Sequence, residues 1–228
     1  MLRVMLLYGL NSFANGGILL ALSLIITLAR AKSGFGFGPR GAGVVFAWFG
    51  AASFLVQLFV FRRFAAKLSS KRLYLVGGGL LCFSCILLPW AAGFVSDYVM
   101  WTALLLDMIM LGAGFMGALP TVNAILANAT DPRMRGFTQG AAASIGALLR
   151  GSAPLLCGIL FAASISRDAP YVVFLFLGAV YMICLAIALS LPEKDVIHEG
   201  ELKLAQEMQL QEMAKAASSE QVKPKEEV

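Results

Sequence analysis

Residues 170–191 read PYVVFLFLGAVYMICLAIALSL and contain no charged side chain. An α-helix rises about 1.5 Å per residue, so this stretch is long enough to cross the roughly 30 Å hydrocarbon core of a bilayer. Five further stretches of mostly apolar residues precede it, at 4–29, 42–61, 73–93, 99–127 and 137–163. The pattern predicts an all-α, polytopic membrane protein with six transmembrane helices.

The composition of the whole chain favours the same fold class. Hydrophobic residues make up 59% of the 228 residues and charged residues only 14%, whereas soluble domains carry about 25% charged residues. A single globular core of this size cannot bury so much apolar surface, because many residues must still face water. A lipid bilayer is therefore the expected surrounding of this chain.

Two of the six stretches, 99–127 and 137–163, are longer than a bilayer requires. Each contains a proline, Pro120 and Pro154, that has no backbone N–H to donate within a helix. We expect both helices to be tilted or kinked. Neighbouring helices can satisfy the freed backbone groups, so the prolines do not exclude either span.

The loops between the spans differ in charge, which predicts the orientation. One side of the membrane receives ten lysines and arginines and the other side receives four; the ten are Arg3, Arg62, Arg63, Lys67, Lys71, Arg72, Arg133, Arg135, Lys194 and Lys203. Cytoplasmic loops carry the excess of Lys and Arg, so both termini are expected in the cytoplasm. The net charge of +5 therefore indicates topology, and no nucleic-acid partner is expected.

The composition changes near Pro192 and divides the chain into two parts. Residues 1–192 are expected to form the six-helix transmembrane domain. Residues 193–228 hold nine acidic residues and five lysines and are expected to form a cytoplasmic tail. Within that tail, 199–216 has the spacing of a weakly amphipathic helix, and the polar end is expected to be disordered.

No pattern in the chain predicts an enzyme, a metal site or a bound cofactor. Cys82 and Cys85 have the spacing of metal ligands, but the only histidine, His198, lies in the tail, so small buried side chains are the favoured interpretation. Residues 112–117, GAGFMG, match the letters of a dinucleotide-binding loop. They lie in the middle of a span, where small residues instead allow close helix packing.

Polar residues inside the apolar spans are the candidate site. Asp107 and Arg150 are the only charges deep within a span, and charges at the bilayer centre are costly and usually face the bundle interior. Asn11 and Asn15 are spaced i, i+4 on the first span, and Gln57 lies in the second. These five residues are candidates for a substrate or proton pathway. The alternative is that they only join helices together.

The depths of the two charges predict that they approach each other. Counting from the ends of their spans at about 1.5 Å per residue, Asp107 lies about 12 Å and Arg150 about 10 Å from the same face. We therefore expect a direct or water-mediated contact. Asp107 would be a proton-coupling site if a conformational change separated the pair, and a permanent ion pair would only fix the register of the helices.

Two segments resemble the major facilitator superfamily of transporters. They are residues 123–140, NAILANATDPRMRGFTQG, and residues 150–158, RGSAPLLCG. The first is similar to the loop between the tenth and eleventh helices of that family. The second is similar to the eleventh helix of its drug:proton antiporter-like branch, with the plant zinc-induced-facilitator-like proteins as suggested relatives. The basic loop 62–72 stands where the family carries a basic motif, but it lacks the acidic residue often found there.

The resemblance implies that residues 1–192 correspond to the C-terminal six helices of such a transporter. The resemblance implies transport of a small solute, coupled to protons as in the drug:proton antiporter-like branch, with a second six-helix half or another copy of the chain as the partner. A rival interpretation is a membrane assembly or regulatory protein that retains the half-fold without transporting. A channel is not favoured, because the sequence shows neither a selectivity filter nor a ring of like charges.

Overall fold

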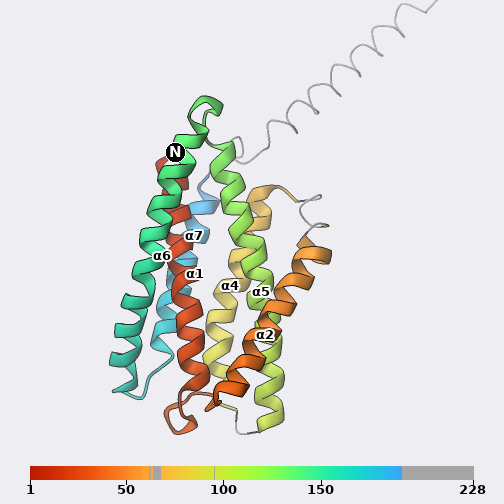
Figure 1. The fold of residues 1–228 in the computed structure, drawn as a ribbon, viewed down its shortest axis with the longest axis vertical. Coiled ribbons are helices and arrows are strands. Elements are labelled where there is room, and N and C mark those ends of the chain that lie inside the picture. Colours follow the sequence, from red (N-terminus) through yellow and green to blue (C-terminus); the bar gives the residue numbers. More distant parts are fainter. Residues whose placement is uncertain (62, 64–67, 95, 192–228) are drawn as a thin grey trace, which may run out of the picture. The chain divides into compact units, whose positions relative to one another are not determined.

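The computed structural model of the chain describes residues 1–61, 63, 68–94 and 96–191. Six long helices make up most of this part, and it contains no strand (Figure 1). They are α1 (Leu2–Thr27), α2 (Pro39–Leu55, continued by the π-helical segment Val56–Phe61), α4 (Ser70–Ala91), α5 (Asp97–Asn128), α6 (Arg135–Ile165) and α7 (Val172–Leu189). The predicted tail helix, 199–216, and the disorder expected after it lie outside the described residues.

Each of the six helices is long and apolar enough to cross a membrane. The prediction of an all-α fold with six spans is therefore confirmed. The ends differ from the predicted bounds by a few residues, because hydropathy marks apolar stretches and not the hydrogen bonds that define a helix. Helices α5 and α6 are longer than their predicted spans at both ends, and α7 is shorter at both ends. Both α5 and α6 continue as α-helix through Pro120 and Pro154.

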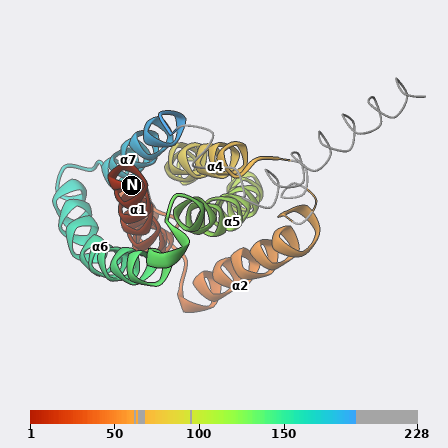
Figure 2. The same ribbon diagram turned by 90° about the horizontal axis from the view of Figure 1, so that it is seen from above.

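Two helices, α1 and α5, lie in the middle of the bundle (Figure 2). Helix α1 packs against α6, α7 and α5, and helix α5 packs against α4 and α2, while α4 also packs against α7. Fourteen residues of α1 are buried, against three of α2. The outer helices α2 and α6 are the least buried of the six and expose long faces to their surroundings.

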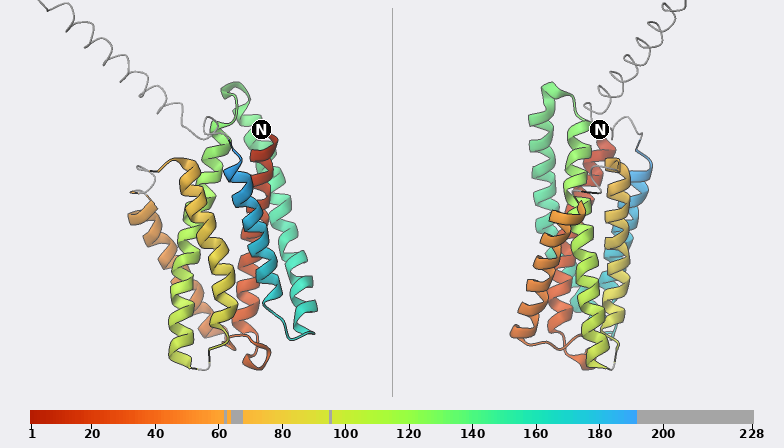
Figure 3. Two further views of the ribbon diagram at one scale, coloured as in Figure 1. Left: turned by 180° about the vertical axis from the view of Figure 1, so that it is seen from behind. Right: turned by 90° about the vertical axis from the view of Figure 1, so that its right-hand side faces the viewer.

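Successive helices run in opposite directions (Figures 1 and 3). The N-terminus, the α5–α6 connection and the end of α7 lie at one end of the bundle. The α1–α2, α4–α5 and α6–α7 connections lie at the other end. This places Arg133 and Arg135 at the same end as Arg3, as the alternating loop charges predict.

The α1–α2 connection folds back onto the end of α1. The backbone N–H of Gly36, whose φ is +69°, donates to the carbonyl of Leu28 over 2.8 Å, and Phe35 donates to Ile25 over 3.1 Å. These bonds satisfy carbonyls that the end of a helix would otherwise leave without a donor. Helix α2 then begins at Pro39, a residue that suits the first turn because its missing N–H is not needed there.

Charged side chains tie helix ends together at both ends of the bundle. Arg30 forms an ion pair of 2.5 Å with Asp97 at the start of α5. At the opposite end, Lys71 Nζ on α4 donates to the carbonyls of Leu189 (2.9 Å) and Leu191 (2.7 Å). A cation at a helix C-terminus interacts favourably with the helix dipole, so Lys71 holds the end of α7 against α4.

Glycines allow α4 and α5 to touch backbone to backbone. A Cβ added at Gly77 would lie 2.7 Å from the backbone nitrogen of Ala118 and 2.9 Å from the carbonyl carbon of Gly117. At Gly114 an added Cβ would lie 2.6 Å from Leu81 Cγ. The interpretation of 112–117 as a packing surface, and not a nucleotide loop, agrees with these contacts.

Gly77→Ala is therefore expected to destabilise the protein by about 1–3 kcal/mol, the usual cost of overpacking, because two backbones must move apart. Gly79→Ala is the matched control on the same helix, since nothing lies within 4 Å of its added Cβ. That control should be neutral or slightly stabilising, because alanine favours helix. Thermal unfolding in detergent measures both. Equal effects of the two substitutions would contradict the close α4–α5 contact.

Candidate functional site

Asn11 and Asn15 lie on the face of α1 that meets α4 and α7. The Asn11 Oδ1 accepts a hydrogen bond of 3.3 Å from the Tyr74 hydroxyl on α4. One turn later, the Asn15 Oδ1 accepts a bond of 2.8 Å from the Tyr181 hydroxyl on α7. All four side chains are buried. The two asparagines therefore join three helices, and both of their Nδ2 atoms have no hydrogen-bond partner among the described residues.

Asp107 is fully buried on α5. The Ser84 hydroxyl on α4 lies near its carboxylate. Even so, the two carboxylate oxygens and the Ser84 hydroxyl have no partner within hydrogen-bond distance in the described part of the chain. Cys85 lies near both Asp107 and Tyr181. A carboxylate in such surroundings is costly unless it is neutralised or bound.

These groups form one buried cluster, which we call the polar core: Asn11, Asn15, Tyr74, Ser84, Asp107 and Tyr181. It lies among α1, α4, α5 and α7. The sequence identified Asn11, Asn15 and Asp107 but missed the two tyrosines and Ser84. In a sequence, a tyrosine inside an apolar span looks like any other large side chain. Because a buried tyrosine hydroxyl usually needs a hydrogen-bond acceptor, the presence of tyrosines in spans that accompany buried asparagines is the signal that could have identified Tyr74 and Tyr181.

Arg150 lies on a different surface. It stands at the middle of α6 and its side chain is exposed. Its backbone packs on α1, because a Cβ added at Gly16 would meet the Arg150 carbonyl oxygen at 2.8 Å. That carbonyl lacks its usual helical donor, since the residue four positions later is Pro154. An exposed arginine halfway along a membrane-crossing helix needs water or a polar partner.

The predicted direct contact between Asp107 and Arg150 is wrong. The carboxylate has no hydrogen-bond partner among the described residues, and their one ion pair joins Arg30 to Asp97. The depth of a residue along a helix does not tell which way its side chain points around the helix axis. Helix α1 packs against both α5 and α6 and lies between them for most of their length (Figure 2).

The exposed surface of α6 has two faces of different character. Large apolar side chains cover one of them: Phe137, Leu148, Leu155 and Ile159. The second carries exposed small residues at helical spacing, namely Gly140, Ser144, Ala147 and Gly151, beside Arg150. We call this second set the open face. A Cβ added at Gly140 or Gly151 would meet nothing within 4 Å.

Gln57 is exposed in the π-helical segment of α2, and no hydrogen bond to another described side chain is found for it. Gly43 and Gly50 precede it at intervals of seven residues, and both are exposed without a neighbour. Helix α2 therefore also exposes small and polar residues together. The five sequence candidates thus fall into two groups, three within the polar core and two on exposed helix faces.

Comparison with known proteins shows a family and solved structures to which this chain is similar. The family model described as Major Facilitator Superfamily matches residues 4–221. The crystal structure of peptide transporter POT in complex with sulfate is similar, with a TM-score of 0.64 at 16% sequence identity, covering 95% of this chain and 44% of that chain. A mutant of POT in complex with alafosfalin matches with a TM-score of 0.63 at 16% identity, covering 95% and 45%.

No curated protein matches the chain significantly. At 16% identity, the likeness to the solved transporters establishes the fold alone. The chain spans less than half the length of the transporter structures that it matches.

Proposed function

Because the chain belongs to the Major Facilitator Superfamily, we propose that it acts as one six-helix half of a carrier that moves a small solute across a membrane. Carriers of this family bind their solute near the midplane, between two six-helix bundles that rock against each other. One bundle supplies one wall of that cavity. A second six-helix half, or another copy of this chain, would supply the other.

The exposed position of Arg150 is the observation that carries this proposal. A guanidinium at the middle of α6 cannot face hydrocarbon without a large cost, and the small residues around it leave room for another molecule. The open face therefore suits the wall of a water-filled cavity. There Arg150 can bind an anionic group of the solute or an acidic side chain of the second half.

Asp107 is proposed as the proton site of the carrier. Helix α1 lies between Asp107 and the open face, so a proton bound at Asp107 would influence transport by changing how α1, α4, α5 and α7 pack. Asn11 and Asn15 would hold that packing through Tyr74 and Tyr181. Gln57, on an exposed face of α2, is proposed to lie along the solute pathway.

We also propose which part of a carrier the chain forms and how it is oriented. Residues 123–140 and 150–158 support the C-terminal half of a drug:proton antiporter-like or zinc-induced-facilitator-like carrier. The loop charges support a cytoplasmic position for both termini and for the tail 193–228. The transport function is favoured over a non-transporting assembly protein because packing against another protein alone would not call for an arginine surrounded by small, exposed residues.

Monomers of the chain are expected to show no concentrative uptake, because a single half leaves the cavity wall open to lipid. The test is reconstitution in liposomes at a lipid excess that isolates single chains, followed by uptake from a panel of labelled small solutes that includes a dipeptide. Liposomes that hold chains crosslinked in pairs are the matched sample for comparison with the single chains. Uptake by monomers would contradict the half-carrier proposal, and inactive, unpaired protein at every density would favour the assembly role.

A further inference from the structure

An apolar pocket of about 210 Å³ lies between α2, α4 and α5, in a part of the bundle to which α6 and α7 contribute no residue. Val56 and Val60 line it from α2, and Leu73 and Val76 line it from α4. Val60 and Val76 are exposed on the outer surface of the bundle. The pocket therefore opens sideways, where a membrane-crossing domain meets hydrocarbon.

Two local features create this pocket. At its back, Gly77 and Gly117 bring the backbones of α4 and α5 together and leave no side chain to fill the space. Along its side, α2 changes from α-helix to π-helix over Val56–Phe61, which widens the helix and shifts its side chains. Wide turns of this kind are rare and often occur at functional sites.

Arginines continue both walls of the pocket toward one end of the bundle. On α4, Arg72 precedes Val76 by four residues and Leu80 by eight, so it lies on the pocket-lining face one turn nearer the end. On the other wall, Arg63 follows Val60 by three residues in helical conformation. Both arginines are exposed. The neighbouring Lys71 is engaged elsewhere, with the carbonyls of Leu189 and Leu191.

We propose that this pocket binds an anionic phospholipid, with an acyl chain between α2 and α4 and the headgroup phosphate at Arg63 and Arg72. The apolar lining suits a hydrocarbon chain and offers no group to a polar solute. The charge at its end suits a phosphate, and 62–72 carries five lysines and arginines without an acidic residue. Basic residues at a membrane surface attract anionic lipid headgroups.

The site is separate from the proposed proton site and from the proposed solute contact at Arg150, because neither Asp107 nor Arg150 lines the pocket. Its consequence is a lipid wedged where α2 joins the α4–α5 pair. Since the back of the pocket is the close Gly77–Gly117 contact, an acyl chain there would brace α2 against that contact. The presence of the lipid would then stabilise the fold in the bilayer.

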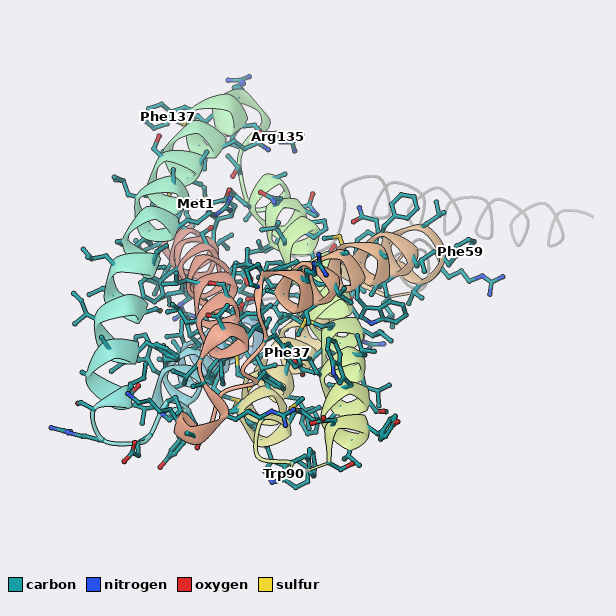
Figure 4. The ribbon with its side chains drawn as sticks, turned by 60° about the horizontal axis from the view of Figure 1, so that its bottom comes forward. Met1, Phe37, Phe59, Trp90, Arg135 and Phe137 are labelled. Carbon is teal, nitrogen blue, oxygen red and sulfur yellow. The ribbon has the colours of Figure 1, made fainter. Side chains whose placement is uncertain are left out.

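Native mass spectrometry of the full chain tests the proposal, using palmitoyl-oleoyl phosphatidylglycerol and the corresponding phosphatidylcholine as probes. The wild type should retain phosphatidylglycerol in preference. Arg63→Gln with Arg72→Gln should weaken that binding roughly thirtyfold, as expected for two basic groups at a membrane surface. The matched control, Arg133→Gln with Arg135→Gln, removes the same charge from the same end of the bundle and should change nothing; Figure 4 shows Arg135 far from Phe59 at the end of α2.

Pocket-filling variants test the acyl-chain half of the site. Val76→Trp should abolish phosphatidylglycerol binding while both arginines remain, and Val60→Trp on the opposite wall serves if the first variant fails to fold. Excess inorganic phosphate should not displace the lipid. The proposal is overturned if folded pocket-filling variants bind normally, if the Arg63 and Arg72 changes have no effect, if the control weakens binding equally, or if phosphate competes.

Discussion

Replacing Asp107 with leucine is expected to raise the thermal stability of the protein and to abolish the proton-dependent solute accumulation that we propose for it. The carboxylate is fully buried, and no described residue forms a hydrogen bond with it. A buried polar group without a hydrogen-bond partner lowers the free energy of unfolding by about 1–3 kcal/mol. Removing the carboxylate should therefore raise the free energy of unfolding by an amount of that order. Gain of stability with loss of activity is typical of substitutions at strained functional positions.

Asn15→Leu is the control for the Asp107 experiment. Asn15 is also buried, but it accepts a hydrogen bond from Tyr181. Its loss should destabilise the protein, because the tyrosine hydroxyl is left buried without an acceptor. Thermal unfolding in detergent and uptake with and without an imposed pH gradient measure the two effects. If Asp107→Leu destabilises as much as Asn15→Leu, or leaves proton-dependent uptake intact, Asp107 is not the proton site.

Arg150→Gln is expected to lower uptake by about a hundredfold or more, the size seen when one partner of a desolvated charge pair is truncated. Its unfolding temperature should stay close to that of the wild type, because the side chain is exposed within this half. Arg135→Gln, at the start of the same helix, is the matched control and should leave uptake near normal. A large loss of stability in Arg150→Gln would mean instead that the arginine holds this half together.

A double-mutant cycle separates the two charges. Helix α1 lies between their helices, and no ion pair joins Asp107 to Arg150. The changes in unfolding free energy caused by Asp107→Asn and by Arg150→Gln should therefore sum to the change in the double mutant within about 0.5 kcal/mol. Compensation in the double mutant, with stability restored toward the wild type, would show that the two charges interact after all.

The six helices could be predicted from the sequence because hydropathy over about twenty residues reports a physical requirement of the bilayer. The role of 112–117 in helix packing was also predictable, since a nucleotide loop cannot stand in the middle of an apolar span. Both inferences depend on local sequence alone. Neither requires knowing which helix is the neighbour of which.

The candidate site was predictable only in part, because its residues come together through the order of helices around the bundle. Asp107 and Arg150 were placed at similar depths, yet α1 separates them, and depth carries no information on that order. Tyr74 and Tyr181 were missed for the same reason: only the packed structure shows that Asn11 and Asn15 are their acceptors. The sequence presents Arg63 and Arg72 only as indicators of topology, whereas the structure places them at the end of an apolar pocket.

The open face of α6 is proposed to border a water-filled cavity. The most direct measurement is the reaction of Ala147→Cys and Leu148→Cys with a membrane-impermeant maleimide, in a chain whose four native cysteines are replaced by alanine. These neighbours lie at nearly the same depth and point about 100° apart, one on the open face and one on the large apolar face. Ser69→Cys and Lys32→Cys mark the two membrane sides and test the proposed orientation.

We expect Ala147→Cys to react and Leu148→Cys to stay unmodified, with Ser69→Cys labelled only from the cytoplasmic side and Lys32→Cys only from the other. Because Leu148 is 75% exposed, protection of its cysteine would report lipid and not burial in the protein. An inert Ala147→Cys, or equal reaction at both positions, would contradict a cavity at the open face.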